Sequence, residues 1–176
     1  MEFRCEGRVD APVDVVYAII RDDLISLVPF LDNVAAITEL ERKPGAAGRT
    51  SVLNRWRAEP GNVPSAVRPF LKPEMLEWLD HAEWSDAESW VDWWIEAPTF
   101  RDLYKCKGRN HIQADGTGTR IAITGELTVD PTNIPGVPSF VGRKMAPMVE
   151  NYLVERIRPN LAGLAVGVNR YMSAKK

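Results

Sequence analysis

The chain has 176 residues, 45% of them apolar, with 22 basic and 24 acidic side chains and a formal net charge of -2. This size and composition predict a single domain over residues 1–176 with a sizeable hydrophobic core. The balanced charge, without any basic run, argues against a nucleic-acid-binding surface. No apolar stretch approaches the ~20 residues that an integral membrane helix requires.

The N-terminal residues and the cysteines predict a cytoplasmic location. Met-Glu-Phe-Arg-Cys lacks the charged and then apolar pattern of a signal peptide. Cys5 and Cys106 lie far apart and show no metal-ligand spacing, as expected for reduced thiols. Transient contact with a membrane surface and the oligomeric state stay open.

The first third of the chain predicts one strand, two short helices and a hairpin. Residues 2–9 alternate in polarity, which is typical of a half-buried strand. Asp10 is a candidate helix cap and Pro12 suits a first helical turn, and a second short helix is expected over residues 24–31. Strands at 34–42 and 49–58 flank a turn that contains Gly45 and Gly48, which predicts a hairpin.

The segment Pro60–Pro73 is rich in proline yet carries apolar side chains such as Phe70. Loops this long and apolar often act as functional lids, and a fixed plug at one end of the core fits the composition equally well. We expect this segment, with Phe140 and Met145 at the start of the last helix, to form the entrance of a cavity.

Further strands are predicted at residues 76–84, 90–97, 101–113 and 119–130, and a long helix is predicted over 139–172. Apolar side chains recur in this last segment at steps of three and four, which indicates one face of a helix that covers the sheet. Pro159 is expected to kink it. The apolar stripe includes Met145, Val149, Tyr152, Leu153, Ile157, Leu161, Leu164, Val168 and Met172.

Five of the six tryptophans fall between Trp78 and Trp94, which is the compositional anomaly of the chain. Side chains alternate between the two faces of a strand. Trp93 therefore points to the opposite face from Trp90 and Trp94. We expect Trp93 inside and the other two outside, against loops or a partner.

The order of the elements resembles that of the START/Bet v 1-like (SRPBCC) superfamily, as does the Ala-Pro-x-x-x-Val-Tyr pattern in Asp10–Tyr17. Glu77, Trp84, the proline-containing segment and Pro135-Gly136-Val137 resemble a bacterial branch of unknown function, distantly like lipid-transfer members. The resemblance implies an α+β helix-grip fold. In this fold a curved antiparallel sheet of about six to seven strands wraps around a long C-terminal helix, and two short helices follow the first strand.

The resemblance also implies a hydrophobic cavity between sheet and helix, used for lipid-, steroid- or polyketide-like ligands. Gly108 and Gly125 lie in mid-strand on the apolar face and are expected to free volume for it. Ordinary core packing is the alternative for each lining residue, and a solvated or salt-bridged side chain is the alternative for Arg156. The candidate ligand-binding residues are Trp93, Ile95, Tyr104, Cys106, Ile123, Leu127, Met145, Met148, Val149, Tyr152, Arg156 and Phe70.

The sequence gives little support for catalysis. It has two histidines, no nucleophile–histidine spacing of a known type and no metal-binding motif, so no catalytic residue, metal or cofactor is expected. We therefore predict a protein that binds or transports a hydrophobic small molecule. The alternatives are a cyclase/aromatase-type enzyme that uses Glu77, His81 or Tyr152 in the same cavity, and an interaction module that uses the outer tryptophans.

Overall fold

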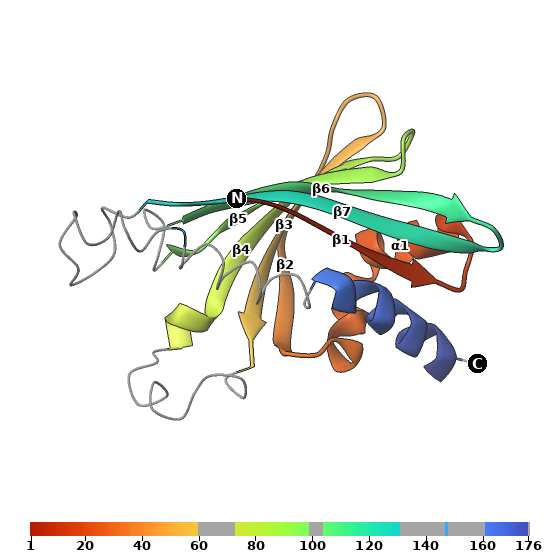
Figure 1. Ribbon diagram of the computed structural model, residues 1–176, viewed down its shortest axis with the longest axis horizontal. Coiled ribbons are helices and arrows are strands. Elements are labelled where there is room, and N and C mark those ends of the chain that lie inside the picture. The colour runs from red at the N-terminus through yellow and green to blue at the C-terminus, as the bar shows by residue number, and fades with distance from the viewer. Residues whose placement is uncertain (60–72, 99–103, 131–146, 148–160, 176) are drawn as a thin grey trace.

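The computed structural model describes residues 1–59, 73–98, 104–130, 147 and 161–175. It shows a curved seven-stranded antiparallel sheet with the helices gathered on one face (Figure 1). The predicted α+β helix-grip architecture is confirmed, with seven strands and with short helices after the first of them. No helix among these residues is long and apolar enough to cross a lipid bilayer.

The elements follow in the predicted order, and most boundaries shift by one or two residues. They are β1 (Glu2–Val9), α1 (Val13–Asp22), the 3-10 helix η1 (Leu24–Phe30), β2 (Val34–Pro44), β3 (Arg49–Ala58), the 3-10 helix η4 (Pro73–Leu76), β4 (Glu77–Ser85), β5 (Trp90–Glu96), β6 (Tyr104–Asp115), β7 (Gly118–Val129) and a C-terminal helix at residues 161–174. The strands lie in the order β1-β7-β6-β5-β4-β3-β2, so that β2 to β7 form a meander and β1 pairs with β7.

Alternation along each strand divides the sheet into an inner apolar face and an outer polar face. In β7, Ile121, Ile123 and Leu127 are at most 1% exposed, while the residues between them include the exposed Thr124 and Glu126. Because the side-chain period is two, the register fixes the same division on every neighbouring strand. The helices cover the inner face (Figure 1).

The C-terminal helix packs directly on β1. Its buried residues Ala165, Val168 and Tyr171 are spaced by three residues, and Val168 is fully buried. Gly7 of β1 allows the close approach, because a Cβ built there would lie 2.5 Å from the Cβ of Ala165. The predicted apolar stripe is confirmed for residues 161–172; its upstream part and the kink at Pro159 lie outside the described residues.

The predicted cap of the first helix is wrong. Pro12 occupies the N-cap position with φ -60° and ψ 154°, and no side chain caps the helix. A capping side chain must directly precede the first helical residue, and Asp10 lies too early in the chain. Its backbone N–H instead donates to Asn169 Oδ1 at 3.0 Å, which ties the end of β1 to the C-terminal helix.

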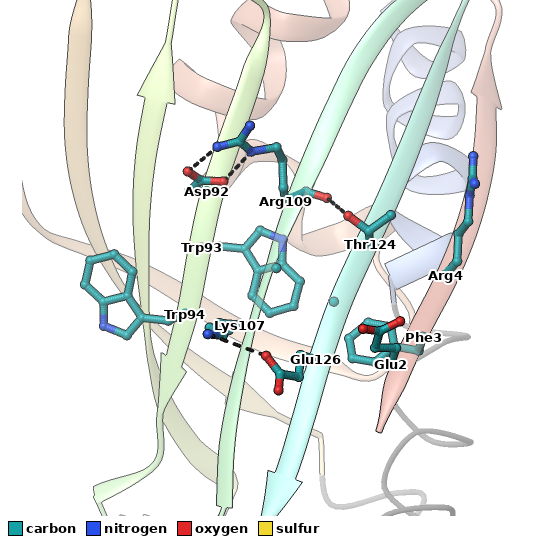
Figure 2. A pocket seen from close by; sticks show the side chains of 12 residues that line it. Glu2, Phe3, Arg4, Asp92, Trp93, Trp94, Lys107, Arg109, Thr124 and Glu126 are labelled. Carbon is teal, nitrogen blue, oxygen red and sulfur yellow. Dashed lines mark hydrogen bonds and ion pairs between the residues drawn. The ribbon is translucent and has the colours of Figure 1, made fainter.

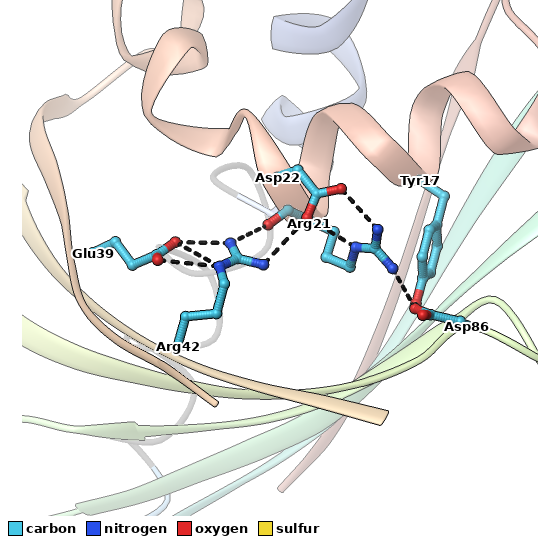
Figure 3. A network of polar contacts seen from close by, with 6 residues as sticks. All are labelled: Tyr17, Arg21, Asp22, Glu39, Arg42 and Asp86. Carbon is cyan, nitrogen blue, oxygen red and sulfur yellow. Dashed lines mark hydrogen bonds and ion pairs between the residues drawn. The ribbon is translucent and has the colours of Figure 1, made fainter. Parts of the chain in front are cut away.

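A polar network fixes α1 to the sheet (Figure 3). Arg21 forms ion pairs with Asp22 and with Asp86 in the β4–β5 turn, and the hydroxyl of Tyr17 donates to Asp86 at 3.0 Å. Arg42 of β2 reaches Asp22 at 3.2 Å. Burial, followed by the contact with Asp86, raises the pKa of Tyr17, so its hydroxyl stays protonated and remains a donor.

We predict that Gly7→Ala lowers the free energy of unfolding by about 1–3 kcal/mol, because the new methyl group overlaps Ala165 and neither backbone can yield easily. Gly163→Ala is the matched control. A Cβ at position 163 of the C-terminal helix meets nothing within 4 Å. Alanine there should stabilise the helix by about 0.5–1 kcal/mol. Urea denaturation measures both values. An equal response of the two variants would contradict the close packing of the helix on β1.

Candidate functional site

Four residues of neighbouring strands form a patch of polar and aromatic side chains on the inner face. Asn54 and Trp56 come from β3, and Trp78 and Asp80 come from β4. The register places Asn54 opposite Asp80 and Trp56 opposite Trp78. Trp78 and Asp80 point to the same face as the buried Ala82, because every second residue of a strand shares a face. Their partners Asn54 and Trp56 lie on that face too. We call these four residues the β3–β4 patch.

Asp80 carries the chemistry of this patch. Burial raises the pKa of its carboxyl from the ordinary 3.8 to about 6, and the nearby side chains of Trp56 and Asn54 partly oppose that shift. Both of these neighbours are neutral. Within the described part of the chain the carboxyl therefore has no cationic partner, and it lies at the edge of the apolar core. Such a group is able to give or take a proton near neutral pH.

The two tryptophans of the patch stack on each other. Their ring centroids are 5.8 Å apart with 20° between the planes, and both side chains are half-buried. The indole N–H of Trp56 is buried and has no well-directed hydrogen bond in the described structure. An unpaired buried donor costs free energy unless a partner arrives. The patch thus offers an acid, a donor and aromatic surface side by side.

Apolar and weakly acidic side chains extend the inner face away from the patch. Ile95 lies opposite Asp80, Cys106 opposite Ile95, and Leu127 opposite Cys106. Burial raises the pKa of Cys106 to about 12 and is the larger cause that raises the pKa of Tyr104 to about 12. Both groups are neutral at physiological pH, so Cys106 is a protonated thiol and a poor nucleophile.

The structure places half of the predicted ligand-binding residues on the inner face. Of these, Ile95 and Tyr104 are half-buried, while the other four are buried in the core. Their role in ligand binding stays a prediction. The six inner-face residues are Trp93, Ile95, Tyr104, Cys106, Ile123 and Leu127; the other six, Phe70, Met145, Met148, Val149, Tyr152 and Arg156, lie outside the described residues, as do most of Pro60–Pro73 and Phe140.

The expectation that two glycines free volume for a ligand is wrong. A Cβ at Gly108 would lie 2.4 Å from the ring of Trp93, and one at Gly125 would lie 2.3 Å from the ring of Phe3. The two rings lie 6.4 Å apart and fill the space above the glycines. Trp93 is fixed there by a buried hydrogen bond of 2.7 Å from its Nε1 to Asn110 Oδ1. The glycines make room for aromatic packing.

The tryptophans divide between the two faces as the alternation predicts. Trp93 is buried inside, and Trp94 lies on the outer face with 41% of its surface exposed. His81, Glu77 and Glu83 also belong to the outer register of β4. The ring of His81 stacks on Trp94 at 4.6 Å, and its Nε2 lies 3.5 Å from Glu96. These groups are separated from the inner face by the sheet.

The sequence analysis missed Asp80 and Asn54. Both stand at positions of the inner register that are otherwise apolar, which was the available signal. The acid proposed for the cavity, Glu77, has the opposite parity and belongs to the outer register of β4. Among the described residues no cluster of three or more histidine, cysteine, aspartate or glutamate side chains could hold a metal ion.

The outer face carries a broad open groove of about 960 Å³ (Figure 2). Its charged residues largely pair with each other: Arg109 binds Asp92 through two bonds of 2.5 and 2.7 Å, and Lys107 lies 3.5 Å from Glu126. Three acidic and three basic groups balance there, so the groove presents no net charge. The lining residues are Glu2, Phe3, Arg4, Asp92, Trp93, Trp94, Lys107, Gly108, Arg109, Thr124, Gly125 and Glu126.

The inner β3–β4 patch is the better candidate site, despite the size of the outer groove. Solvent-exposed ion pairs such as those of the groove are screened and satisfied by each other and by water. The half-buried Asp80, by contrast, has a desolvated carboxyl whose hydrogen-bonding neighbours among the described residues, Trp56 and Asn54, are both neutral. Functional sites concentrate such perturbed groups.

Comparisons with known proteins support the fold. A protein of Thermus thermophilus, TTHA0849, is 24% identical over the whole of both chains, with a TM-score of 0.67. The Zhui aromatase/cyclase of a Streptomyces species is 14% identical, with coverage of 97% of this chain and 93% of that one and a TM-score of 0.66. Norcoclaurine synthase from Thalictrum flavum, solved with dopamine and hydroxybenzaldehyde, is 14% identical, with 96% and 85% coverage and a TM-score of 0.58. No family model and no curated protein matches the sequence.

We predict that the stability difference between Asp80→Asn and wild type depends on pH. An acid with a raised pKa costs nothing below the unfolded value of 3.8. The free-energy cost of ionising Asp80 in the folded protein grows as pH rises from about 4 to about 6, and it reaches its full value above pH 6. At roughly 1.4 kcal/mol per unit, Asp80→Asn should gain about 2.5 kcal/mol relative to wild type between pH 4 and pH 8.

Urea titrations of both proteins across this pH range measure the difference directly. The absolute effect of the amide at pH 4 serves as the internal reference, because it contains the packing change without most of the ionisation penalty. A pH-independent difference would show that the Asp80 carboxyl is not desolvated.

Proposed function

We propose that this chain binds a hydrophobic small molecule against the inner face of its sheet, with the β3–β4 patch as the polar end of the site. The observation that carries the proposal is the half-buried, desolvated carboxyl of Asp80, which stands without a charged partner in the described structure beside a half-exposed tryptophan pair. The same fold serves an aromatase/cyclase and norcoclaurine synthase crystallised with dopamine and hydroxybenzaldehyde. These neighbours support the binding of a small molecule by this fold.

The energetics explain why such a site needs a polar anchor. A ligand that buries ~300 Å² of apolar surface gains roughly 7 kcal/mol at ~25 cal/mol per Å². Association costs at least ~4 kcal/mol, so apolar contact alone gives weak binding. Asp80, Asn54 and the Trp56 N–H supply hydrogen-bonding groups in a region of low dielectric, where such bonds are stronger than in water. Lipid-, steroid- and polyketide-like molecules remain the proposed range, in a single-domain cytoplasmic protein.

A second candidate is a cyclase/aromatase-type enzyme, and the pKa of Asp80 favours it. A catalytic base works best when its pKa lies near the operating pH, and that of Asp80 is raised to about 6. In an aldol cyclisation the carboxylate would take a proton from a carbon next to one carbonyl group. That carbon would then bond to the second carbonyl carbon, whose oxygen takes the proton back, and water would leave after ring closure. Formation of 3-methylcyclohex-2-enone from heptane-2,6-dione, followed by absorbance, tests this chemistry. Equal rates with wild type and Asp80→Asn would exclude Asp80 as the base.

We predict that Trp78→Ala weakens binding of the neutral fluorescent probe N-phenyl-1-naphthylamine at least tenfold, because it removes one ring of the half-exposed pair on the inner face. Trp94→Ala is the matched control. It removes the same side chain from the outer face, at the edge of the groove, and should leave the affinity unchanged.

Fluorescence titration measures both affinities, and circular dichroism confirms that both variants fold. Loss of binding in Trp94→Ala with retention in Trp78→Ala would place the ligand in the outer groove and overturn the proposal. Native mass spectrometry of gently purified protein would then identify any molecule that stays bound.

A further inference from the structure

We propose that the ligand of the inner face is an organic cation, an apolar body bearing an ammonium group that is held between the Asp80 carboxylate and the stacked Trp56–Trp78 pair. This inference rests on the proposed function, because it names the ligand class of the same site. It is carried by the arrangement of the β3–β4 patch and by the charges of the groups around it.

The first argument is the missing positive charge. Buried carboxylates in proteins are normally paired with a cation, because desolvation of a lone charge is costly. Among the described residues, the groups that stabilise ionised Asp80 are the neutral side chains of Trp56 and Asn54. An ammonium group would supply both the opposite charge and N–H donors. A neutral ligand would leave the charge unpaired, and an anionic ligand would be repelled.

The second argument is the aromatic surface next to the carboxyl. Trp78 and Asp80 lie two residues apart on the same face of β4, which separates them by about 7 Å along the strand. Trp56 lies opposite Trp78, with 5.8 Å between the ring centroids. An indole face is the best aromatic partner for a cation within ~6 Å. One nitrogen can therefore contact the carboxylate and an indole ring together.

The third argument is that the other titratable groups facing the patch do not compete for the ligand's charge. Tyr104 and Cys106 of β6 stay neutral, because burial holds the pKa of each at about 12. Glu39 of β2 lies opposite Asn54, and Arg42 binds it at 2.7 Å. Ile95 of β5, opposite Asp80, offers apolar contact. Within the described residues, Asp80 is thus the acid that faces the patch without a cationic partner.

A protonated Asp80 that donates a hydrogen bond to a ligand carbonyl is the competing account. The two accounts predict opposite responses to pH. A cation binds the ionised carboxylate, so its affinity falls as pH drops through about 6. A carbonyl ligand binds the protonated acid, so its affinity rises over the same range.

Three naphthalene probes of similar size test the proposal: 1-naphthylmethylamine, which is cationic, 1-naphthylmethanol, which is neutral, and 1-naphthoate, which is anionic. At pH 7.5 the amine should bind wild type at least tenfold more tightly than the alcohol. Asp80→Asn should remove this preference. Asp92→Asn, on the outer face beside Arg109, is the matched control and should retain it.

A measurement on the wild type alone complements the variants. Between pH 7.5 and pH 5 the affinity for the amine should fall about tenfold, as expected for protonation of one group with a pKa near 6, while that for the alcohol stays constant. Equal binding of amine and alcohol, or tightest binding of 1-naphthoate, would overturn the inference.

The outcomes separate this inference from the proposed function. If the alcohol binds as well as the amine and Trp78→Ala weakens both, a hydrophobic site exists and the cationic preference is wrong. If none of the three probes nor N-phenyl-1-naphthylamine binds, the proposed function itself fails, and the inference fails with it.

Discussion

The constraint on which this structure depends is the alternation of side chains along seven paired strands. It sends one set of residues to a largely apolar inner face and the other to a polar outer face. Gly7 then lets the C-terminal helix approach β1 at Ala165, and the network around Arg21 and Asp86 fixes α1 to the sheet. Because the register is continuous from β3 to β1, a polar residue of the inner parity on these strands cannot turn to the outer face.

Asp80 is such a residue, and a carboxyl on the inner face suggests a role in ligand binding. The inner face around it suits an apolar molecule, because Ala82 lies two residues along β4 and Ile95 lies opposite on β5. The ionised carboxyl costs free energy there unless a positive charge lies beside it. Ionisable groups with pKa values shifted by desolvation cluster at functional sites. The paired charges of the outer groove lack this property.

Much of the fold could be predicted from the sequence, because period-two and helical patterns depend on local polarity. They assigned every strand and the opposite faces of Trp93 and Trp94. The use of Gly108 and Gly125 could not be predicted, since it depends on which aromatic ring crosses from a neighbouring strand. The cap of α1 failed because Pro12 itself takes the N-cap position, where a side-chain oxygen from Asp10 was expected.

The site was predicted less well than the fold, for a physical reason. Parity along the strands predicts inner-face residues such as Ile95 and Tyr104. The raised pKa of Asp80 depends instead on desolvation and on its neutral neighbours in β3. Both are properties of the folded arrangement. The parity of Asn54 and Asp80 marked them as polar residues of an apolar face, yet their adjacency depends on the register between two strands.

The most direct test of the account is the titration of the Asp80 carboxyl carbon, followed by carbon-13 NMR in the folded protein and assigned by comparison with Asp80→Asn. A pKa near 6 in the free protein is the predicted result. A value near 4, as in a solvated aspartate, would contradict the account, because the carboxyl would then be neither buried nor in need of a partner.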